Sequence, residues 1–392
     1  MSKNIAMISS SDEKWKNHKY YNKKLHTLTK TELQELQGDI NKIMGKHRGP
    51  PPVYEAYFYL FLGFSYAAAA YFFTNKIVEM EIFPYWLMFI FYSIVAGTIW
   101  TGAAWTKAHT CGHYGMFKSK IHNDIVGFVL HSALLVPYFS WQFSHGQLHH
   151  KYTNHTTKGE THVPPTKKGA RLILKMKRAM GDDAFALLKI AYTFFIGWPM
   201  YLIFNVSGGR VQADDRTVRF TKGAWKDHFH LGSESMSDKL GNKVMLSTLG
   251  CLATLIAVFT YFSDPMFWYF GPYVVTNSWL TAYTYLQHTH EDMPHFGDDE
   301  WTFLKGALST IDRPYHPIIN HLHDMIGADH LSHHICYDME PRKSMKATEE
   351  LKELLGPLYN YDDRNPFVAL FQTEKRCEYI DSVDGIQWYK SH

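Results

Sequence analysis

Long uncharged stretches alternate with polar ones along the chain. Residues 1–49 are polar, and a Gly-Pro-Pro-Pro run at 49–52 separates them from an apolar stretch at 53–74. A short polar link follows, and a second apolar stretch at 83–105 is rich in aromatic residues. Each stretch is long enough to cross the roughly 30 Å hydrocarbon core of a bilayer as a helix. The pattern therefore predicts a helical hairpin in a membrane.

The second half of the chain repeats this pattern. Apolar stretches at 244–262 and 266–286 are joined only by Ser-Asp-Pro, which predicts a second hairpin. Two other apolar stretches are interrupted: 125–143 contains a proline, and 184–204 contains a Gly-Trp-Pro run. Because proline breaks or bends a helix, we expect both to be interfacial or re-entrant rather than full spans.

Three groups of histidines stand just beyond the apolar stretches or in the polar region after the last one. They are His109-Thr-Cys-Gly-His113, His145-Gly-Gln-Leu-His149-His150 and His330-Leu-Ser-His333-His334. Residues three or four apart share one face of an α-helix. The first pair can therefore point at one metal ion, and His330 reaches both later histidines of its group.

The second histidine group is less simple. On an α-helix His145 and His149 share a face, whereas His150 is rotated by about 100°. Either the helix ends at this point or His150 serves a second metal ion.

The number of histidines indicates a metal centre. A single buried histidine is usually a hydrogen-bonded core residue, but eight imidazoles buried without metal would leave many polar atoms in need of partners. Hydrolytic zinc sites use three protein ligands, and neutral imidazole also suits iron. Two iron ions with positions open for O₂ fit this ligand count. Acids nearby, Glu291, Asp292 and Asp329, leave a mixed ligand set open.

The position of the histidines fixes the expected organisation. If all groups face one compartment, an even number of spans separates them, so 184–204 is placed at the interface. The two far-side loops carry a single basic residue, Lys76, which puts the histidines in the cytosol by the positive-inside rule. We therefore expect an all-α multi-pass membrane protein with about four transmembrane helices in two hairpins, interfacial helices and a cytosolic histidine-rich helical cap. The expected segments are 1–49 (cytosolic), 50–108 (first hairpin), 109–243 (cytosolic or interfacial, first two histidine groups), 244–288 (second hairpin) and 289–392 (cytosolic, third group).

Charge and cysteines add little to this picture. The formal net charge is only +3, so nothing points to a nucleic-acid partner. The four cysteines form no C-x-x-C pair, and the polar, lysine-rich N-terminus has no apolar core of a signal peptide. The stretch 167–178 is basic and amphipathic. It favours contact with lipid headgroups, and docking of an acidic electron-transfer partner is the alternative.

The three groups and their surroundings resemble the membrane fatty-acid desaturases, closest to the microsomal omega-6 (delta-12) and omega-3 acyl-lipid enzymes. The family pattern is H-x(3–4)-H, H-x(2–3)-H-H and H-x(2)-H-H, and Leu-Val-Pro-Tyr-Phe-Ser-Trp at 135–141 and Thr-Tyr-Leu-Gln-His-Thr-His at 284–290 also match. The resemblance implies two iron ions held by a set of histidines: His109, His113, His145, His149, His150, His330, His333, His334 and one further residue. His288 is the choice for that residue and His290 its competitor. Thr110, His290 and Asp329 are candidates for orienting the ligands.

The resemblance also implies the chemistry. The expected enzyme uses O₂ and electrons from a cytochrome b5-type donor to place a cis double bond, at delta-12 (oleate to linoleate) or at omega-3, in a C18 chain carried by a phospholipid. In a eukaryote it would reside in the endoplasmic reticulum membrane. Thr110 stands where the family usually has an acid, and the second group has one extra residue before its histidine pair. A divergent hydroxylase, acetylenase or conjugase is therefore the nearer alternative.

A metal transporter or non-catalytic metal binder is the alternative from another class. Transporters place polar groups within their spans to form a path. The spans expected here are nearly free of ionisable groups, and the histidines lie outside them, which argues against transport.

Overall fold

The computed structural model describes residues 13–159, 161–209, 227–230 and 240–391. These residues are mostly helical and contain almost no strand, which confirms the predicted all-α class. The α-helices are α1 (Lys30–His47), α2 (Val53–Glu79), α3 (Tyr85–Trp100), α4 (Lys107–Gly112), α5 (Lys120–Ala133), α6 (Tyr138–Phe143), α7 (Arg171–Met180), α8 (Asp182–Tyr192), α9 (Trp198–Phe204), α10 (Asn242–Tyr261), α11 (Gly271–His288), α12 (Phe303–Leu308), α13 (Pro317–Leu322), α14 (His330–Ile335), α15 (Pro341–Leu355) and α16 (Pro366–Arg376).

Shorter elements link these helices. Four are π-helical turns: η3 (Thr101–Thr106), η4 (Ser144–His149), η5 (Thr193–Gly197) and η7 (Met266–Phe270). Three are 3₁₀ turns: η1 (Glu13–Trp15), η2 (Leu25–Thr27) and η8 (Gly356–Leu358). Two-residue strands β1 (His295–Phe296) and β2 (Ile386–Gln387) pair antiparallel. Residues 1–12 of the expected N-terminal segment and parts of 210–239 lie outside the described residues.

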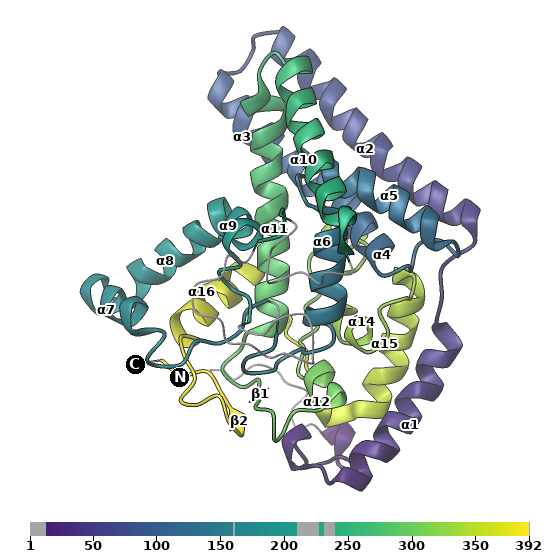
Figure 1. The fold of residues 1–392 in the computed structure, drawn as a ribbon, viewed down its shortest axis with the longest axis vertical. Coiled ribbons are helices and arrows are strands. Elements are labelled where there is room, and N and C mark those ends of the chain that lie inside the picture. The colour runs from purple at the N-terminus through teal and green to yellow at the C-terminus, as the bar shows by residue number, and fades with distance from the viewer. Residues whose placement is uncertain (1–12, 160, 210–226, 231–239, 392) are drawn as a thin grey trace.

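The long helices stand together at the top of Figure 1, with α11 running through the middle of the molecule. α2 and α3 follow one another as a hairpin, as do α10 and α11. α11 packs along α3, and Gly97 allows this close approach because a Cβ there would lie 2.5 Å from the carbonyl oxygen of Pro272. α3, η3 and α4 form one continuous helix that carries the first histidine pair to its end.

Four helical stretches are long and apolar enough to cross a membrane: 53–79, 85–112, 182–204 and 242–261. The number agrees with the expected four, but 182–204 replaces 266–286. α11 is enclosed by protein, so its sequence need not be as apolar as that of a helix facing lipid. Its buried residues include Thr276, Asn277 and Thr281. A helix shielded from lipid can carry polar side chains that bond to its neighbours.

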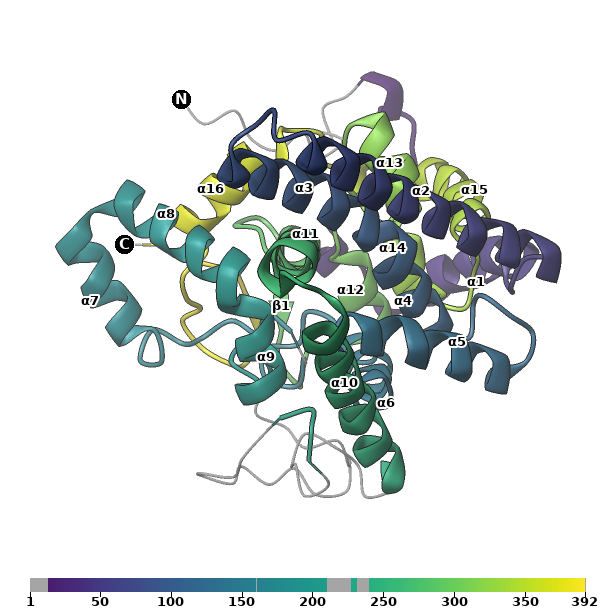
Figure 2. The ribbon, with the colours of Figure 1, turned by 90° about the horizontal axis from the view of Figure 1, so that it is seen from above.

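The stretch 182–204 differs from α11 in orientation. Figure 2 shows α11 end-on, whereas α8 lies lengthwise across the view. Its interfacial placement remains a prediction. The other interrupted stretch is divided in two: α5 and the helix 138–149 meet at 114°, with Pro137 just before α6. It does not run as one straight span.

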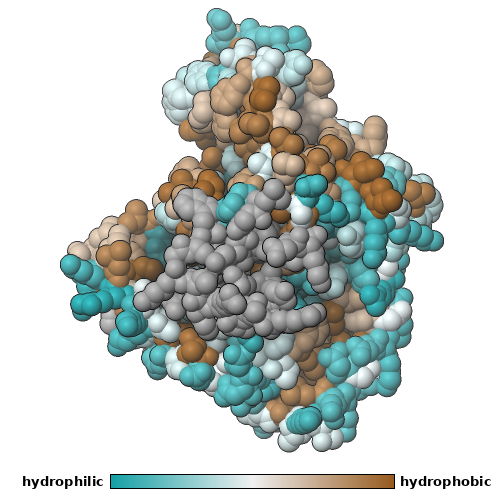
Figure 3. Space-filling view, viewed as in Figure 1, coloured by the Kyte–Doolittle hydropathy of each residue, from teal (hydrophilic) through white to brown (hydrophobic). Residues whose placement is uncertain are grey.

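The lower part of the molecule is a helical cap. α1 packs on α15 and α14 on α12, around a core that includes Leu36, Leu331 and Leu351. The face in Figure 3 is largely hydrophobic over the upper helices and more hydrophilic below.

Buried polar contacts tie the cap to the end of α11. The Asp312 carboxylate accepts a hydrogen bond from the backbone N–H of Leu331 (2.8 Å), and the Arg313 Nε donates to the carbonyl oxygen of Leu286 (2.9 Å). These bonds place α14, with the third histidine group, beside His288.

Candidate metal centre

Nine histidines converge where α4, η4, α11 and α14 meet. All nine predicted ligands are brought together, and eight of them fall into two groups by the position of their ring nitrogens. The first holds His109, His113, His145, His150 and His333; the second holds His149, His288 and His334. Within each group one nitrogen from every ring lies within 4.8 Å of the others.

The first group is formed by three elements. The ring nitrogens Nε2 of His109 and His145 are 3.0 Å apart, and those of His145 and His150 are 3.3 Å apart. The rings of His113 and His333 have centroids 4.9 Å apart. Neutral imidazoles meet in this way when their lone pairs are directed at a common point, as around one ion.

His330 completes the second group. Its Nε2 lies 2.8 Å from the Nε2 of His288, and its ring centroid lies 4.5 Å from that of His334. The rings of His150 and His334 stack at 4.3 Å and so join the two groups. Five and four imidazoles in adjacent sets have the donor arrangement of two neighbouring metal sites.

The expectation that His145 and His149 share a face was wrong, because the segment Ser144–His149 is π-helical. The backbone N–H of His150 donates to the carbonyl oxygen of His145 (3.0 Å), the i to i+5 bond of a π-helix. Residues five apart then share a face, so His145 and His150 enter the first group and His149 enters the second. The three histidines of residues 145–150 are therefore shared between the two groups.

The histidines of residues 330–334 are also divided between the two groups. His330 and His334 lie together, but the centroid of His333 is 6.0 Å from that of His330, and His333 turns toward His109 (4.7 Å). The expectation that His330 reaches both later histidines therefore holds for His334 only. On a one-and-a-half-turn helix, residues 333 and 334 point in directions about 100° apart.

Burial keeps these rings neutral. It lowers the pKa of His149 and of His333 to about 3, and the pKa values of His150 and His334 well below the usual range. Neutral imidazole is the form that binds metal. Among the described residues, no hydrogen-bond partner meets the buried Nε2 atoms of His113, His333 and His334. Buried polar atoms without partners are costly, and a bound ion would satisfy them.

Two threonines that the sequence reasoning missed orient the rings. Thr153 Oγ1 lies 2.9 Å from Nδ1 of His334 and 2.8 Å from the carbonyl oxygen of His149. Thr161 Oγ1 lies 2.8 Å from Nδ1 of His149. When Nδ1–H donates to the hydroxyl, the lone pair of Nε2 faces the site. The spacing of Thr153, three and four residues after the histidine pair, was the available signal.

The three candidate orienting residues differ in their surroundings and partners. Thr110 donates to the carbonyl oxygen of Thr106 in its own helix (2.9 Å). Asp329 is buried immediately before α14, and burial raises its pKa well above the usual range. His290 lies outside both groups, with its Nδ1 accepting from the backbone of Asp292 (3.0 Å). The structure thus brings His288, and not His290, to the centre.

Aromatic rings form the walls of the site. Trp141 stacks on His145 (centroids 4.5 Å apart, planes 17° apart), and Trp105 stacks on His109 (5.2 Å). Tyr337 lies against His113 (5.0 Å). These rings exclude water and limit the movement of the histidines they cover.

A helical fold with membrane-length helices and a buried cluster of histidines that could hold metal ions defines a class of protein: a membrane protein with a candidate metal centre. Comparison with known sequences makes the class specific. The family described as fatty acid desaturase matches residues 84–364, so this chain belongs to the fatty acid desaturase family and is an oxidoreductase acting on fatty acyl chains. This excludes the transporter alternative.

Curated relatives agree with the family match. A delta(12) fatty acid desaturase of Calendula officinalis is 34% identical over 90% of this chain and 91% of its own length. A delta(12) fatty acid desaturase of Mortierella alpina is 33% identical over 81% and 79%. The oleoyl-12-hydroxylase of Ricinus communis is 31% identical over 80% and 81%. The similarity therefore extends over most of the chain.

Proposed function

We propose that the nine histidines hold two iron ions and that the enzyme introduces a cis double bond at delta-12 of a C18 acyl chain in a phospholipid. The observation that carries the metal assignment is the division of the histidines into two adjacent sets with buried, partnerless nitrogens. Delta-12 rests on the names of the relatives. When bound, two irons would supply the activation of O₂ and the removal of hydrogen from an unactivated methylene.

A cavity beside the histidines suits the acyl chain. It has a volume of about 600 Å³ and reaches His145 and His149, one residue from each group. Its walls are mainly apolar and include Trp141, Trp198 and Leu280. An acyl chain lying here would be held against the metal sites while the aromatic walls exclude water.

The mouth of this cavity lies under α7 and α8. Ile173, Met176 and Leu188 line it and are exposed to the surroundings. α7 combines Ile173 and Met176 with two lysines and two arginines, the composition of a helix that lies among lipid headgroups. A phospholipid could therefore insert its chain from the membrane surface while its headgroup stays among the basic residues.

The remaining partners and the location follow from the family. We propose a separate cytochrome b5-type electron donor and residence in the endoplasmic reticulum membrane with the histidines in the cytosol. The basic residues of 167–178 offer an electrostatic contact for an acidic donor. Loss of product in a yeast without its cytochrome b5, restored by adding the gene back, would test the donor.

Hydroxylation is the second candidate, because one relative is an oleoyl-12-hydroxylase. Both reactions begin with hydrogen removal from the same region of the chain, so the reaction product distinguishes them.

The test is expression in a yeast that lacks polyunsaturated fatty acids, with and without added linoleate. Fatty acids are profiled by gas chromatography–mass spectrometry beside a His149→Ala control. New linoleate without feeding, absent from the control, supports delta-12 desaturation. An omega-3 product only on feeding, or a hydroxylated product, would replace that assignment. No new lipid from well-expressed, iron-loaded protein would refute oleate as the substrate.

A further inference from the structure

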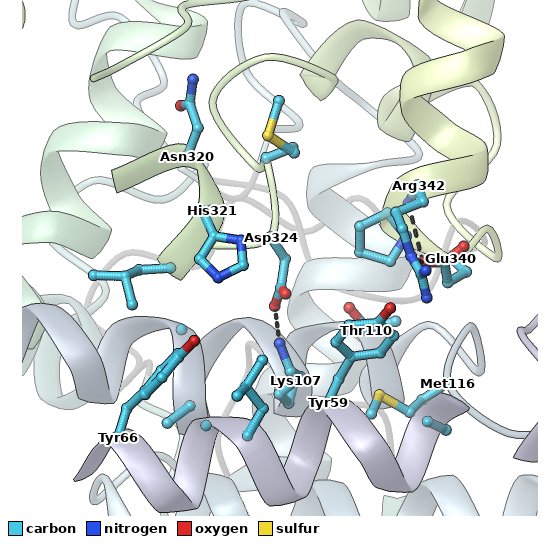
Figure 4. A pocket seen from close by; sticks show the side chains of 18 of the residues that line it. Tyr59, Tyr66, Lys107, Thr110, Met116, Asn320, His321, Asp324, Glu340 and Arg342 are labelled. Atoms are coloured by element: carbon cyan, nitrogen blue, oxygen red, sulfur yellow. Dashed lines mark hydrogen bonds and ion pairs between the residues drawn. The ribbon is translucent and has the colours of Figure 1, made fainter. Parts of the chain in front are cut away.

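A second cavity shares no lining residue with the acyl-chain cavity. One part of it, about 480 Å³, is enclosed by α2, η3, α13 and α15 (Figure 4). The other part, about 860 Å³, continues between α2 and α3. Tyr66, Ile99 and Leu322 line both parts. We call the whole the α2 groove.

The α2 groove runs across the hydrophobic region. Ala56 lines one end and Ile77 the other, a separation of about 31 Å along a helix. This matches the roughly 30 Å thickness of a bilayer core. Phe73 (72% exposed) and Ile318 (62% exposed) stand at its rim. Because these exposed side chains are apolar, the part between α2 and α3 opens toward lipid rather than toward water.

The end of the α2 groove near Ala56 is polar and carries charges of both signs, one guanidinium and two carboxylates. Arg342 pairs with Glu55 (2.8 Å) and Glu340 (3.0 Å) and lies over the ring of Tyr59 (4.3 Å). Figure 4 shows Arg342 beside Glu340 at the mouth. The Arg342 side chain is half exposed, so its remaining N–H groups can meet an incoming phosphate.

A buried ion pair separates the α2 groove from the metal centre. Lys107 Nζ donates to the Asp324 carboxylate, which also accepts from the hydroxyl of Thr106. Figure 4 shows the pair among the side chains that line the groove, and none of the nine histidines lines it. An occupant of the groove therefore lies beside the centre without reaching it.

We propose that the α2 groove binds a zwitterionic glycerophospholipid that is not the substrate. One acyl chain lies along α2 toward Phe73, the phosphate meets Arg342, and the ammonium group meets Glu55 or Glu340. The apolar length exceeds half a bilayer, so it holds the tail of a lipid from the histidine-side leaflet. The mouth offers two carboxylates to one guanidinium, which favours a headgroup that carries an ammonium group beside its phosphate over an anionic one. The proposal does not depend on the reaction or on delta-12.

The experiment is photo-crosslinking of the purified full-length protein with a phosphatidylcholine that carries a diazirine on its acyl chain. Labelled peptides are mapped by mass spectrometry. We expect labels on α2 and on α13. Ala70→Trp fills the groove and should reduce this labelling about tenfold, a binding loss of about 1.4 kcal/mol.

Ala68→Trp is the matched control. Ala68 is exposed on the same helix and is not part of the groove lining, so its labelling should equal that of wild type. If the Ala70 variant aggregates in size-exclusion chromatography, Val95→Trp on the facing wall replaces it. Equal labelling of the filled and control variants would show only surrounding bilayer lipid and overturn the site.

Competition tests the headgroup. Unlabelled dioleoylphosphatidylcholine should displace the probe at lower concentration than dioleoylphosphatidylglycerol. Arg342→Glu should weaken labelling, whereas Arg48→Glu, at an exposed arginine that does not line the groove, should not. Equal displacement by the anionic lipid would overturn the zwitterionic assignment. Each readout is a label and not a reaction product, so failure of this proposal is distinguishable from failure of the proposed activity.

Discussion

Thr153→Val tests whether a buried hydroxyl orients a metal-binding ring. Valine keeps the shape of threonine but cannot accept the proton of His334 Nδ1, which lies 2.9 Å from Oγ1. The Nδ1 group is buried and would lose its partner, at a cost of about 1–3 kcal/mol. At about 1.4 kcal/mol per factor of ten, the affinity of the second group for its ion should fall by roughly 5- to 150-fold.

The assay measures iron per protein by inductively coupled plasma mass spectrometry during titration with a chelator, together with product formation in yeast. We expect the variant to lose about half its iron at chelator concentrations that leave wild type loaded, since the first group is not touched. Thr310→Val is the control: Thr310 is fully buried, and within the described part of the chain its hydroxyl donates to the carbonyl oxygen of Ala307 (2.8 Å) and to no other group. Wild-type iron retention and activity in Thr153→Val would refute the orienting role.

Three further predictions concern the cavity, the packing and the pH response. Leu188→Trp should narrow the mouth of the acyl-chain cavity and reduce product about tenfold with iron unchanged, whereas Leu187→Trp, outside the lining, should not; equal activities would contradict the assigned entrance. Gly102→Ala should lower the melting temperature, since a Cβ would lie 1.6 Å from the carbonyl oxygen of Leu322 and overpacking costs about 1–3 kcal/mol. Gly38→Ala, with open space around it, should not destabilise, and similar melting temperatures for both would refute this packing. Burial lowers the pKa of His295 to about 4, so its stabilising contribution is complete above the unfolded pKa of about 6.5 and is lost as pH falls toward 4. At pH 5 the stability lost through protonation of His295 is about 2 kcal/mol. His295→Gln removes this titration and should flatten the fall in melting temperature between pH 7 and 5; an unchanged slope would disprove the contribution of His295.

Much of the fold could be predicted because lipid imposes a simple rule on sequence. A helix that faces hydrocarbon must be apolar over about 20 residues, and α2 and α10 obey this. α11 is the exception that shows the limit, because its neighbours shield it and its polar residues bond within the protein. α13 was not predicted at all. Its six residues carry no periodic signal, and its position is set by the packing of Leu322 against Gly102.

The sequence by itself identified eight of the nine histidines of the centre, whereas the structure chose His288 over His290. Three histidine groups at short spacing needed no structure to identify, because imidazoles so dense and so close to apolar stretches have few uses other than metal binding. It also determined the membrane class and the family, since both are carried by local patterns.

Only the tertiary structure decided how the nine histidines are shared. The π-helical turn sends His145 and His150 one way and His149 the other, and α14 divides His333 from His334. The reason is physical: spacing along a chain predicts facing only if the helix type is known. Whether a segment adopts α or π geometry depends on the packing around it, which here includes Trp141 and the end of α11. The same holds for Thr153 and for the α2 groove, whose parts are distant in sequence and meet only in the folded chain.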